Sequence, residues 1–331
     1  MDYKDKIKNE RLRATFSDNF RLTRLLADYL EIYPEIIKAE MVDTLCQSGF
    51  TKEEALVALL SEIFGLEFDR PDDRRLIMEY LTPAVRIMDG KRYTDNPYYK
   101  RVKIPNVTDG NWELRQESYK AYRGVIVGDM EISDDFKEYA PLGFFTEEFH
   151  FPAVLEDGNE WMTLTPVDLD TCERAIEDAC GKVITFGLGL GYYAYMVSGK
   201  PNVESITVIE KSDKVIELFK EYVLPHFEHP EKVRIINADA FEYAEHVMPG
   251  ECYDYAFVDT WRDASDGEPM YRRMKALEHL SPTTEFSYWI EGFIVSRIRS
   301  LKYAELCDKW VAGVLDNSAD EVKDMLKKPL S

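Results

Sequence analysis

The stretch KVITFGLGLGYY, residues 182–193, decides the fold of this chain. Its first apolar residues read as a short buried strand, and a helix is expected to follow the glycines. Those glycines are Gly187, Gly189 and Gly191. Glycine lets a backbone approach a ligand closely, and such a turn points main-chain N–H groups at the start of the next helix. The motif indicates either a nucleotide loop or a tight turn that only packs a strand against a helix. Tyr192 stands where the NAD fingerprint has its last glycine, which argues against an ordinary dinucleotide site.

Downstream of this motif, short apolar runs alternate with helical segments. The runs are SITVIE (205–210), VRIIN (233–237), YDYAFVD (253–259) and FSYWIE (286–291), and a helix over 167–179 precedes the first strand. This order predicts an α/β fold of the Rossmann-like, doubly wound type, with a mainly parallel sheet and helices on both faces. Ligands of such sheets bind outside the carboxyl ends of the strands. Functional residues are therefore expected where each run ends.

Acidic residues stand at these strand ends. Glu210 lies about 20 residues beyond the last glycine, where a carboxylate can accept hydrogen bonds from both hydroxyls of a ribose; the alternative is a solvated acid before a helix capped by Ser212. Asp239 can accept from the exocyclic amine of a purine or can cap a helix. Asp259 ends the fourth strand, where it would orient an amine or accept its proton. A hydrated acidic rim is the alternative there, and Glu291 is expected at the same mouth.

Residues 182–266 resemble the S-adenosylmethionine-binding core of class I methyltransferases, and within that superfamily they look most like spermidine synthases. The resemblance makes GLGLG (187–191) the nucleotide loop, Glu210 the ribose acid and NADAF (237–241) the adenine-side motif. It implies S-adenosylmethionine as the cofactor, held by Gly187, Leu188, Gly189, Gly191, Glu210, Asp239 and Ala240. Asp259 matches the catalytic aspartate that ends the fourth strand in spermidine synthases. Tyr192 joins it as a candidate catalytic residue that shapes the pocket by packing or hydrogen bonding.

The chain also departs from these families. Thr185 stands two residues before the first glycine, where methyltransferases commonly have an acidic residue. Leu188 and Leu190 occupy loop positions at which spermidine synthases carry an aspartate. The residues TPVD (165–168) replace the acidic motif that follows their hairpin. The first departure removes an expected contact to the amino group of the cofactor, and the second argues against a polyamine substrate.

Three segments are expected along the chain: a helical module over 1–95, a β-rich hairpin region over 96–165, and the Rossmann-like domain over 166–331 with a helical C-terminal extension. Helical periodicity begins near Asn19, and Thr51 with Glu54 forms a capping-box signature. Asp157-Gly158 predicts a tight hairpin. The N-terminal helices carry no visible chemistry and are expected to pack a core or to form a homo-oligomer.

Composition excludes several classes of protein. The chain has 331 residues with 41 Lys and Arg against 62 Asp and Glu, a net charge of −21 that disfavours nucleic acid as a partner. Its five cysteines form no C-x-x-C pair, and the charged start resembles no secretory signal, so a cytoplasmic protein without a membrane partner is expected. No metal site is predicted, since the pair His226 and His229 lies between prolines without other ligands.

The expected function is S-adenosylmethionine-dependent methyl transfer to a small, amine or cationic substrate, because an acidic mouth attracts cations. Two alternatives remain open. One is aminopropyl transfer from decarboxylated S-adenosylmethionine, as in spermidine synthases. The other is a scaffold that binds the cofactor or its product without turnover.

Overall fold

The computed structural model describes residues 3–311 and 319–328. Contacts within the chain divide it into two compact units. The first unit takes its residues from 1–88, 119–149 and 292–331, and the second takes 89–118 and 150–291. The chain passes between the units several times, so neither unit is one continuous segment.

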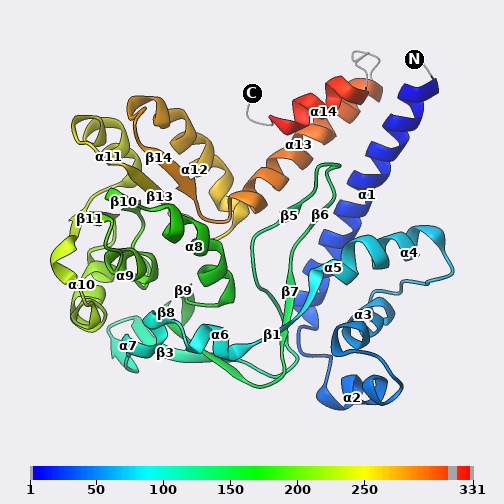
Figure 1. The fold of residues 1–331 in the computed structure, drawn as a ribbon, viewed down its shortest axis with the longest axis horizontal. Coiled ribbons are helices and arrows are strands. Elements are labelled where there is room, and N and C mark those ends of the chain that lie inside the picture. Colours follow the sequence, from blue (N-terminus) through cyan, green and yellow to red (C-terminus); the bar gives the residue numbers. More distant parts are fainter. Residues whose placement is uncertain (1–2, 312–318, 329–331) are drawn as a thin grey trace. The chain divides into compact units, whose positions relative to one another are not determined.

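The second unit is built on a five-stranded sheet (Figure 1). In spatial order its strands are β12 (Val233–Asn237), β11 (Val203–Glu210), β10 (Gly181–Phe186), β13 (Tyr255–Val258) and β14 (Glu285–Tyr288). All neighbouring strands are parallel. The central strands are almost continuously apolar and buried, as in sheets that helices cover on both faces. The structure thus has the α/β class and the parallel sheet expected from the sequence. The strand order reverses beside β10, and at such a reversal α/β sheets form a crevice.

One helix precedes these strands in the chain, and four helices connect them. They are α8 (Pro166–Asp178), α9 (Tyr192–Ser198), α10 (Asp213–Tyr222), α11 (Ala240–His246) and α12 (Ala264–Leu277). Side-chain caps fix where α10, α11 and α12 begin. The Ser212 hydroxyl accepts from the Val215 amide at 3.3 Å, and Asp263 accepts from the amides of Ser265 and Asp266 at 2.6 and 3.1 Å. Short 3₁₀ turns cover Leu224–His226, Pro230–Lys232, Met248–Gly250 and Glu278–Leu280.

A four-stranded sheet precedes the parallel sheet in the chain, after the short helices α6 (Gly90–Thr94) and α7 (Pro97–Arg101). Its spatial order is β2 (Val107–Asp109), β3 (Trp112–Tyr119), β8 (Phe149–Glu156) and β9 (Asn159–Thr163). β8 and β9 pair antiparallel across Asp157 and Gly158, whose φ angles are 52° and 75°. Two positive φ values are typical of a tight primed turn, so the hairpin predicted there is confirmed.

The first unit is mainly helical. Its helices are α1 (Tyr3–Ile32), α2 (Ala39–Gln47), α3 (Lys52–Ile63), α4 (Pro71–Leu76), α5 (Thr82–Ala84), α13 (Glu291–Val311) and α14 (Ala319–Lys327), with a π-helical turn over Ile77–Leu81. A small sheet has the order β1 (Val85–Met88), β7 (Leu142–Phe145), β4 (Gly124–Ile126), and β5 (Glu131–Ile132) pairs with β6 (Glu138–Tyr139). The Thr51 capping box is confirmed, with Glu54 N–H donating to the Thr51 hydroxyl at 3.2 Å. α1 starts far before Asn19, because its first turns consist mostly of charged residues with good helix propensity.

A buried ion pair ties α13 to the small strands of this unit. Arg299 on α13 and Glu138 on β6 are 7% and 3% exposed, and their charged groups are in direct contact. The Ser296 hydroxyl donates to the same carboxylate at 2.6 Å. A charge removed from water in this way is stable only while its partner is present.

The expected segments 1–95, 96–165 and 166–331 do not coincide with the two units. Residues 119–149 of the expected β-rich region supply β4 to β7 of the first unit. The C-terminal extension is helical where it is described, but from residue 292 it also belongs to the first unit rather than to the parallel sheet. Local periodicity carries no signal for such long-range pairing. Among the described residues, no helix has the length and apolar character that crossing a membrane requires.

Candidate functional site

A cavity of about 550 Å³ opens at the carboxyl ends of the parallel strands, within the size range of small-molecule sites. It is lined by Glu160, Trp161, Met162, Thr163, Asp168, Gly187, Leu188, Gly189, Ile209, Glu210, Lys211, Ala238, Asp239, Ala240, Phe241, Asp259, Thr260, Trp261, Arg262, Asp266, Met270 and Trp289. Of the seven expected cofactor-binding residues, only Gly191 lies outside this lining. Gly191 instead precedes α9 with a positive φ of 73°.

The glycine loop is too closely packed for larger residues. A Cβ at Gly187, where φ is +102°, would lie 1.8 Å from the backbone oxygen of Asp259. One at Gly189 would lie 2.1 Å from the sulfur of Met162, which accepts a hydrogen bond from the Leu190 amide at 3.0 Å. The loop therefore needs glycine at these two positions for its own packing.

Glu210 lies at the end of β11 beside this loop. Its Oε2 accepts from the Leu188 amide at 3.1 Å and its Oε1 from the Ser212 amide at 2.8 Å. Each carboxylate oxygen has a second lone pair, so both oxygens can still accept from hydroxyl groups in the cavity. The structure thus orients Glu210 with backbone contacts and leaves acceptor capacity for a ligand.

Asp239 caps α11, as the alternative interpretation of the sequence held. One oxygen, Oδ1, accepts from the amides of Phe241 and Glu242 at 2.9 and 3.1 Å. Asp239 is exposed and lines the cavity with Ala240, so its cap and a contact to a ligand through the other oxygen are compatible. Glu291, in contrast, does not line the cavity; it accepts from the Tyr271 hydroxyl at 2.6 Å.

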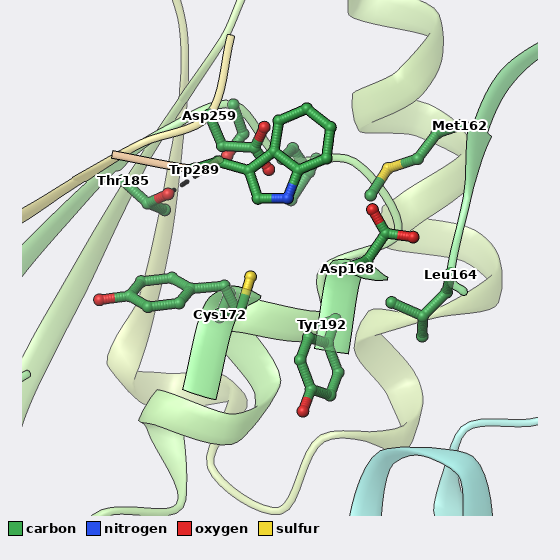
Figure 2. Close-up of a pocket in the computed structure, with 12 residues that line it drawn as sticks. Met162, Leu164, Asp168, Cys172, Thr185, Tyr192, Asp259 and Trp289 are labelled. Atoms are coloured by element: carbon green, nitrogen blue, oxygen red, sulfur yellow. Dashed lines mark hydrogen bonds between the residues drawn. The ribbon is translucent and has the colours of Figure 1, made fainter. Parts of the chain in front are cut away.

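Behind the main cavity lies a small inner chamber, shown in Figure 2, with about 20 Å³ of room, enough for one group of the size of water. Its walls are Met162, Leu164, Asp168, Cys172, Thr185, Gly187, Leu188, Tyr192, Tyr193, Ala194, Asp259 and Trp289. Several of these residues also line the main cavity, so the two spaces share a wall. We call this space the inner chamber below.

Two carboxyl groups, of Asp168 and Asp259, face the inner chamber around the indole of Trp289 (Figure 2). Burial, followed by the charges of Asp168 and Glu210, raises the pKa of Asp259 to about 8. Burial also raises the pKa of Asp168 to about 6, against the effect of its hydrogen bonds from Thr165. A strongly perturbed carboxyl group in a cavity is typical of functional sites.

Tyr192 is buried at the start of α9 and contacts the inner chamber rather than the main cavity. Its hydroxyl accepts from the amide of Asn96 at 3.1 Å, and its ring packs edge-on against Tyr98 at 5.6 Å. Burial raises the pKa of Tyr192 above its ordinary value, so the phenol stays protonated near neutral pH. These contacts give Tyr192 a packing position in the chamber wall.

Among the cavity residues that the sequence did not predict as site residues, several bear on the chemistry of the site. Asp168 was noted only as part of a departure, although its place three residues after Thr165 gives a capping-box signal. Met162 and Trp289 carry no motif. Trp261 is 6% exposed, and its indole nitrogen has no hydrogen-bond partner in the described part of the chain; the same holds for the Thr260 hydroxyl. Orphaned polar groups beside a cavity suit a ligand that supplies the missing partners.

Comparisons with known proteins give fold-level similarity alone. Models of known families and curated protein sequences give no match. Among solved structures, the chain is similar to spermidine synthase from Thermotoga maritima, with 16% identity and a TM-score of 0.31 over 47% of this chain and 60% of that one. It is also similar to precorrin-8W decarboxylase from Methanobacterium thermoautotrophicum, with 17% identity and a TM-score of 0.29 over 38% and 63% of the two chains. This chain thus spans about three fifths of each of these proteins, and similarities of this size do not extend to substrate or reaction.

Proposed function

We propose that this protein is an S-adenosylmethionine-dependent methyltransferase that acts on a small amine. The observation that carries the proposal is the placement of Glu210 and Asp239 at the ends of neighbouring parallel strands, beside the glycine loop and in one cavity. Carboxylates in these places are suited to a ribose and an adenine. The cavity continues from them past Gly187 to Asp259, where the sulfur end of the ligand would lie.

The residues present fit such a ligand. Gly187 and Gly189 line the cavity, and a glycine loop before a helix can present backbone N–H groups to a nucleotide. Trp261 and Thr260 hold buried polar atoms beside the cavity that find no hydrogen-bond partner among the described residues. The free lone pairs of Glu210 accept hydroxyl hydrogens. Each of these features is a place for a polar ligand rather than for solvent alone.

When bound, S-adenosylmethionine supplies a methyl group on a positively charged sulfur, which a neutral amine can attack without further activation. The protein then has to hold the amine in line, remove its proton and keep water away. Asp259 is placed for the first two tasks at the wall shared by the cavity and the inner chamber. A pKa raised to about 8 makes Asp259 a stronger base than an ordinary carboxylate, and its ionised fraction, which grows as pH approaches 8, can take the proton that the amine releases. Trp289 and Met162 cover the same wall with apolar surface.

One observation favours a second candidate, aminopropyl transfer from decarboxylated S-adenosylmethionine. The chamber walls, all within the described residues, include two carboxyl groups and no Lys, Arg or His. A tail that bears only an ammonium group suits such walls, whereas a tail carboxylate would meet two acids without a counter-charge. In this case the acceptor amine would form a bond to the tail carbon next to the sulfur, the bond between that carbon and the sulfur would break, and 5′-methylthioadenosine would leave.

Calorimetric titration separates these functions. S-adenosylmethionine, its decarboxylated form and S-adenosylhomocysteine would each be titrated into the purified protein. The methyltransferase proposal expects the first and third ligands to bind and Glu210→Ala to abolish binding. Glu204→Ala, which alters an exposed residue on the same strand outside the cavity, is the matched control. Preference for the decarboxylated ligand would favour aminopropyl transfer, and no binding of any ligand would refute both.

Turnover is tested separately. Asp259→Asn keeps the shape of the side chain but cannot accept the proton, so methyl transfer to amines should slow while S-adenosylhomocysteine still binds. A variant with full activity would remove Asp259 from the mechanism. Binding without turnover on any amine would identify the third alternative, a protein that binds the cofactor without catalysis.

A further inference from the structure

The inner chamber contains a carboxylate that the sequence-based site did not include. Asp168 is the third residue of α8, and its Oδ2 accepts from the Thr165 amide at 2.7 Å and from the Thr165 hydroxyl at 2.8 Å. Thr165 is itself 4% exposed, so this anchor is rigid. The anchored carboxyl group lines both the chamber and the main cavity, and Figure 2 shows it turned toward Met162 beneath Trp289. Its orientation is therefore set before any ligand binds.

The surroundings of Asp168 leave its charge without a neutralising partner. Within the described residues that form the chamber, none is basic, and no ion pair to Asp168 is formed. Apart from Asp259, Thr185 and Cys172, the rest of the wall is apolar or aromatic and includes Leu164, Tyr192 and Trp289. A carboxylate in such a place is stabilised by a cation that enters the chamber, because few water molecules can do so in its stead.

The size of the chamber limits that cation. Its room of about 20 Å³ fits one water-sized group, which an ammonium head matches and a larger cation such as a guanidinium does not. The strand β10 supplies no competing acid, since Thr185 stands at its end and its hydroxyl lies 3.4 Å from the Gly187 oxygen. The charge of Asp168 enters the chamber wall from the helix α8 instead.

Resting on the proposed function, we propose that Asp168 binds the ammonium group at the tail of the S-adenosyl ligand and so selects ligands that carry it. Asp168 is a specificity-determining residue in this role, and Asp259 remains the group that faces the acceptor. The nucleoside end is held by other residues, so the contribution of Asp168 is separable from that of the rest of the site. Thr165 is a positioning residue that acts through Asp168.

Two ligands test this assignment. Both contain a neutral thioether sulfur, so the positive charge of a sulfonium does not contribute to their binding. S-adenosylhomocysteine carries the amine-bearing tail, and 5′-methylthioadenosine carries the same nucleoside and sulfur with only a methyl group. Both would be titrated by calorimetry into the wild-type protein and into Asp168→Asn, which keeps an oxygen for the Thr165 anchor. Asp170→Asn is the matched control, because Asp170 lies on the same helix but contacts Arg92 and the Tyr93 hydroxyl outside the chamber.

We expect Asp168→Asn to weaken the binding of S-adenosylhomocysteine about 10- to 100-fold, which is the effect of losing one charge-assisted hydrogen bond. Binding of 5′-methylthioadenosine should stay within about threefold of wild type, which also demonstrates that the variant is folded. Equal losses for both ligands, no loss for either, or an amine-dependent loss only in Asp259→Asn would overturn the assignment to Asp168. Failure of both ligands to bind wild-type protein would refute the proposed function itself and this inference with it.

Discussion

Replacing Asp259 by Asn should change how the stability of the second unit depends on pH. Asp259 has an ordinary pKa of 3.8 that the fold raises to about 8, chiefly by burial and then by the charges of Asp168 and Glu210. Between these two values the unfolded chain has lost its proton while the native state still holds it. Stability must therefore fall as pH rises through this window, and the loss is complete above pH 8.

The size of the effect follows from the two pKa values. Each pH unit inside the window lowers the free energy of unfolding by about 1.4 kcal/mol. From pH 5 to pH 9 the wild-type protein should thus lose about 4 kcal/mol that Asp259→Asn does not lose. Asp168 also lowers the free energy of unfolding as pH rises, by a smaller amount and at lower pH, because its pKa is raised only to about 6. The charge of Asp168 helps to raise the pKa of Asp259, so Asp168→Asn should lower the pKa of Asp259 and shift its loss of stability to lower pH.

Urea unfolding followed by tryptophan fluorescence measures this difference. Four of the five tryptophans, Trp112, Trp161, Trp261 and Trp289, belong to the second unit, so the signal reports mainly on it. Unfolding free energies of wild type and Asp259→Asn would be compared at pH 5, 7 and 9, with the exposed Glu285→Gln as the control. A difference between wild type and Asp259→Asn that stays constant within about 1 kcal/mol across this range would refute the reasoning.

Three further changes test other parts of the structure. Gly187→Ala should destabilise the second unit by on the order of 3 kcal/mol, since its Cβ meets the Asp259 oxygen; thermal unfolding unchanged from wild type would contradict this packing. Glu210→Gln should weaken S-adenosylhomocysteine about tenfold or more in calorimetry, and unaltered affinity would exclude it as the ribose acid. Arg299→Met should destabilise the first unit by about 3–5 kcal/mol by leaving Glu138 buried without its partner. The double variant Arg299→Met with Glu138→Gln should regain much of that stability. If the single variant Arg299→Met and the double variant are equally stable, the ion pair does not stabilise the fold as argued.

The sequence by itself determined the local elements that position the proposed nucleotide end of the site. Alternating apolar runs and helical segments indicated a parallel sheet, because a buried strand and a covering helix each have their own periodicity. Gly187 and Gly189 could be recognised as loop residues, and Glu210 as a strand-end acid, because their roles depend on spacing along the chain. The turn at Asp157 and Gly158 was predictable for the same reason, since it needs only two neighbouring residues.

Tertiary structure alone decided what the inner end of the site contains. Asp168 comes from the helix before the glycine loop and Trp289 from the end of the last strand, so no local spacing connects them with Asp259. Met162 reaches Gly189 from a hairpin of another sheet. The division into units was equally hidden, because residues 119–149 and those after 291 join the N-terminal helices through contacts distant in sequence. Burial and charge proximity, which set the pKa values of Asp168 and Asp259, exist only once these distant segments have packed together.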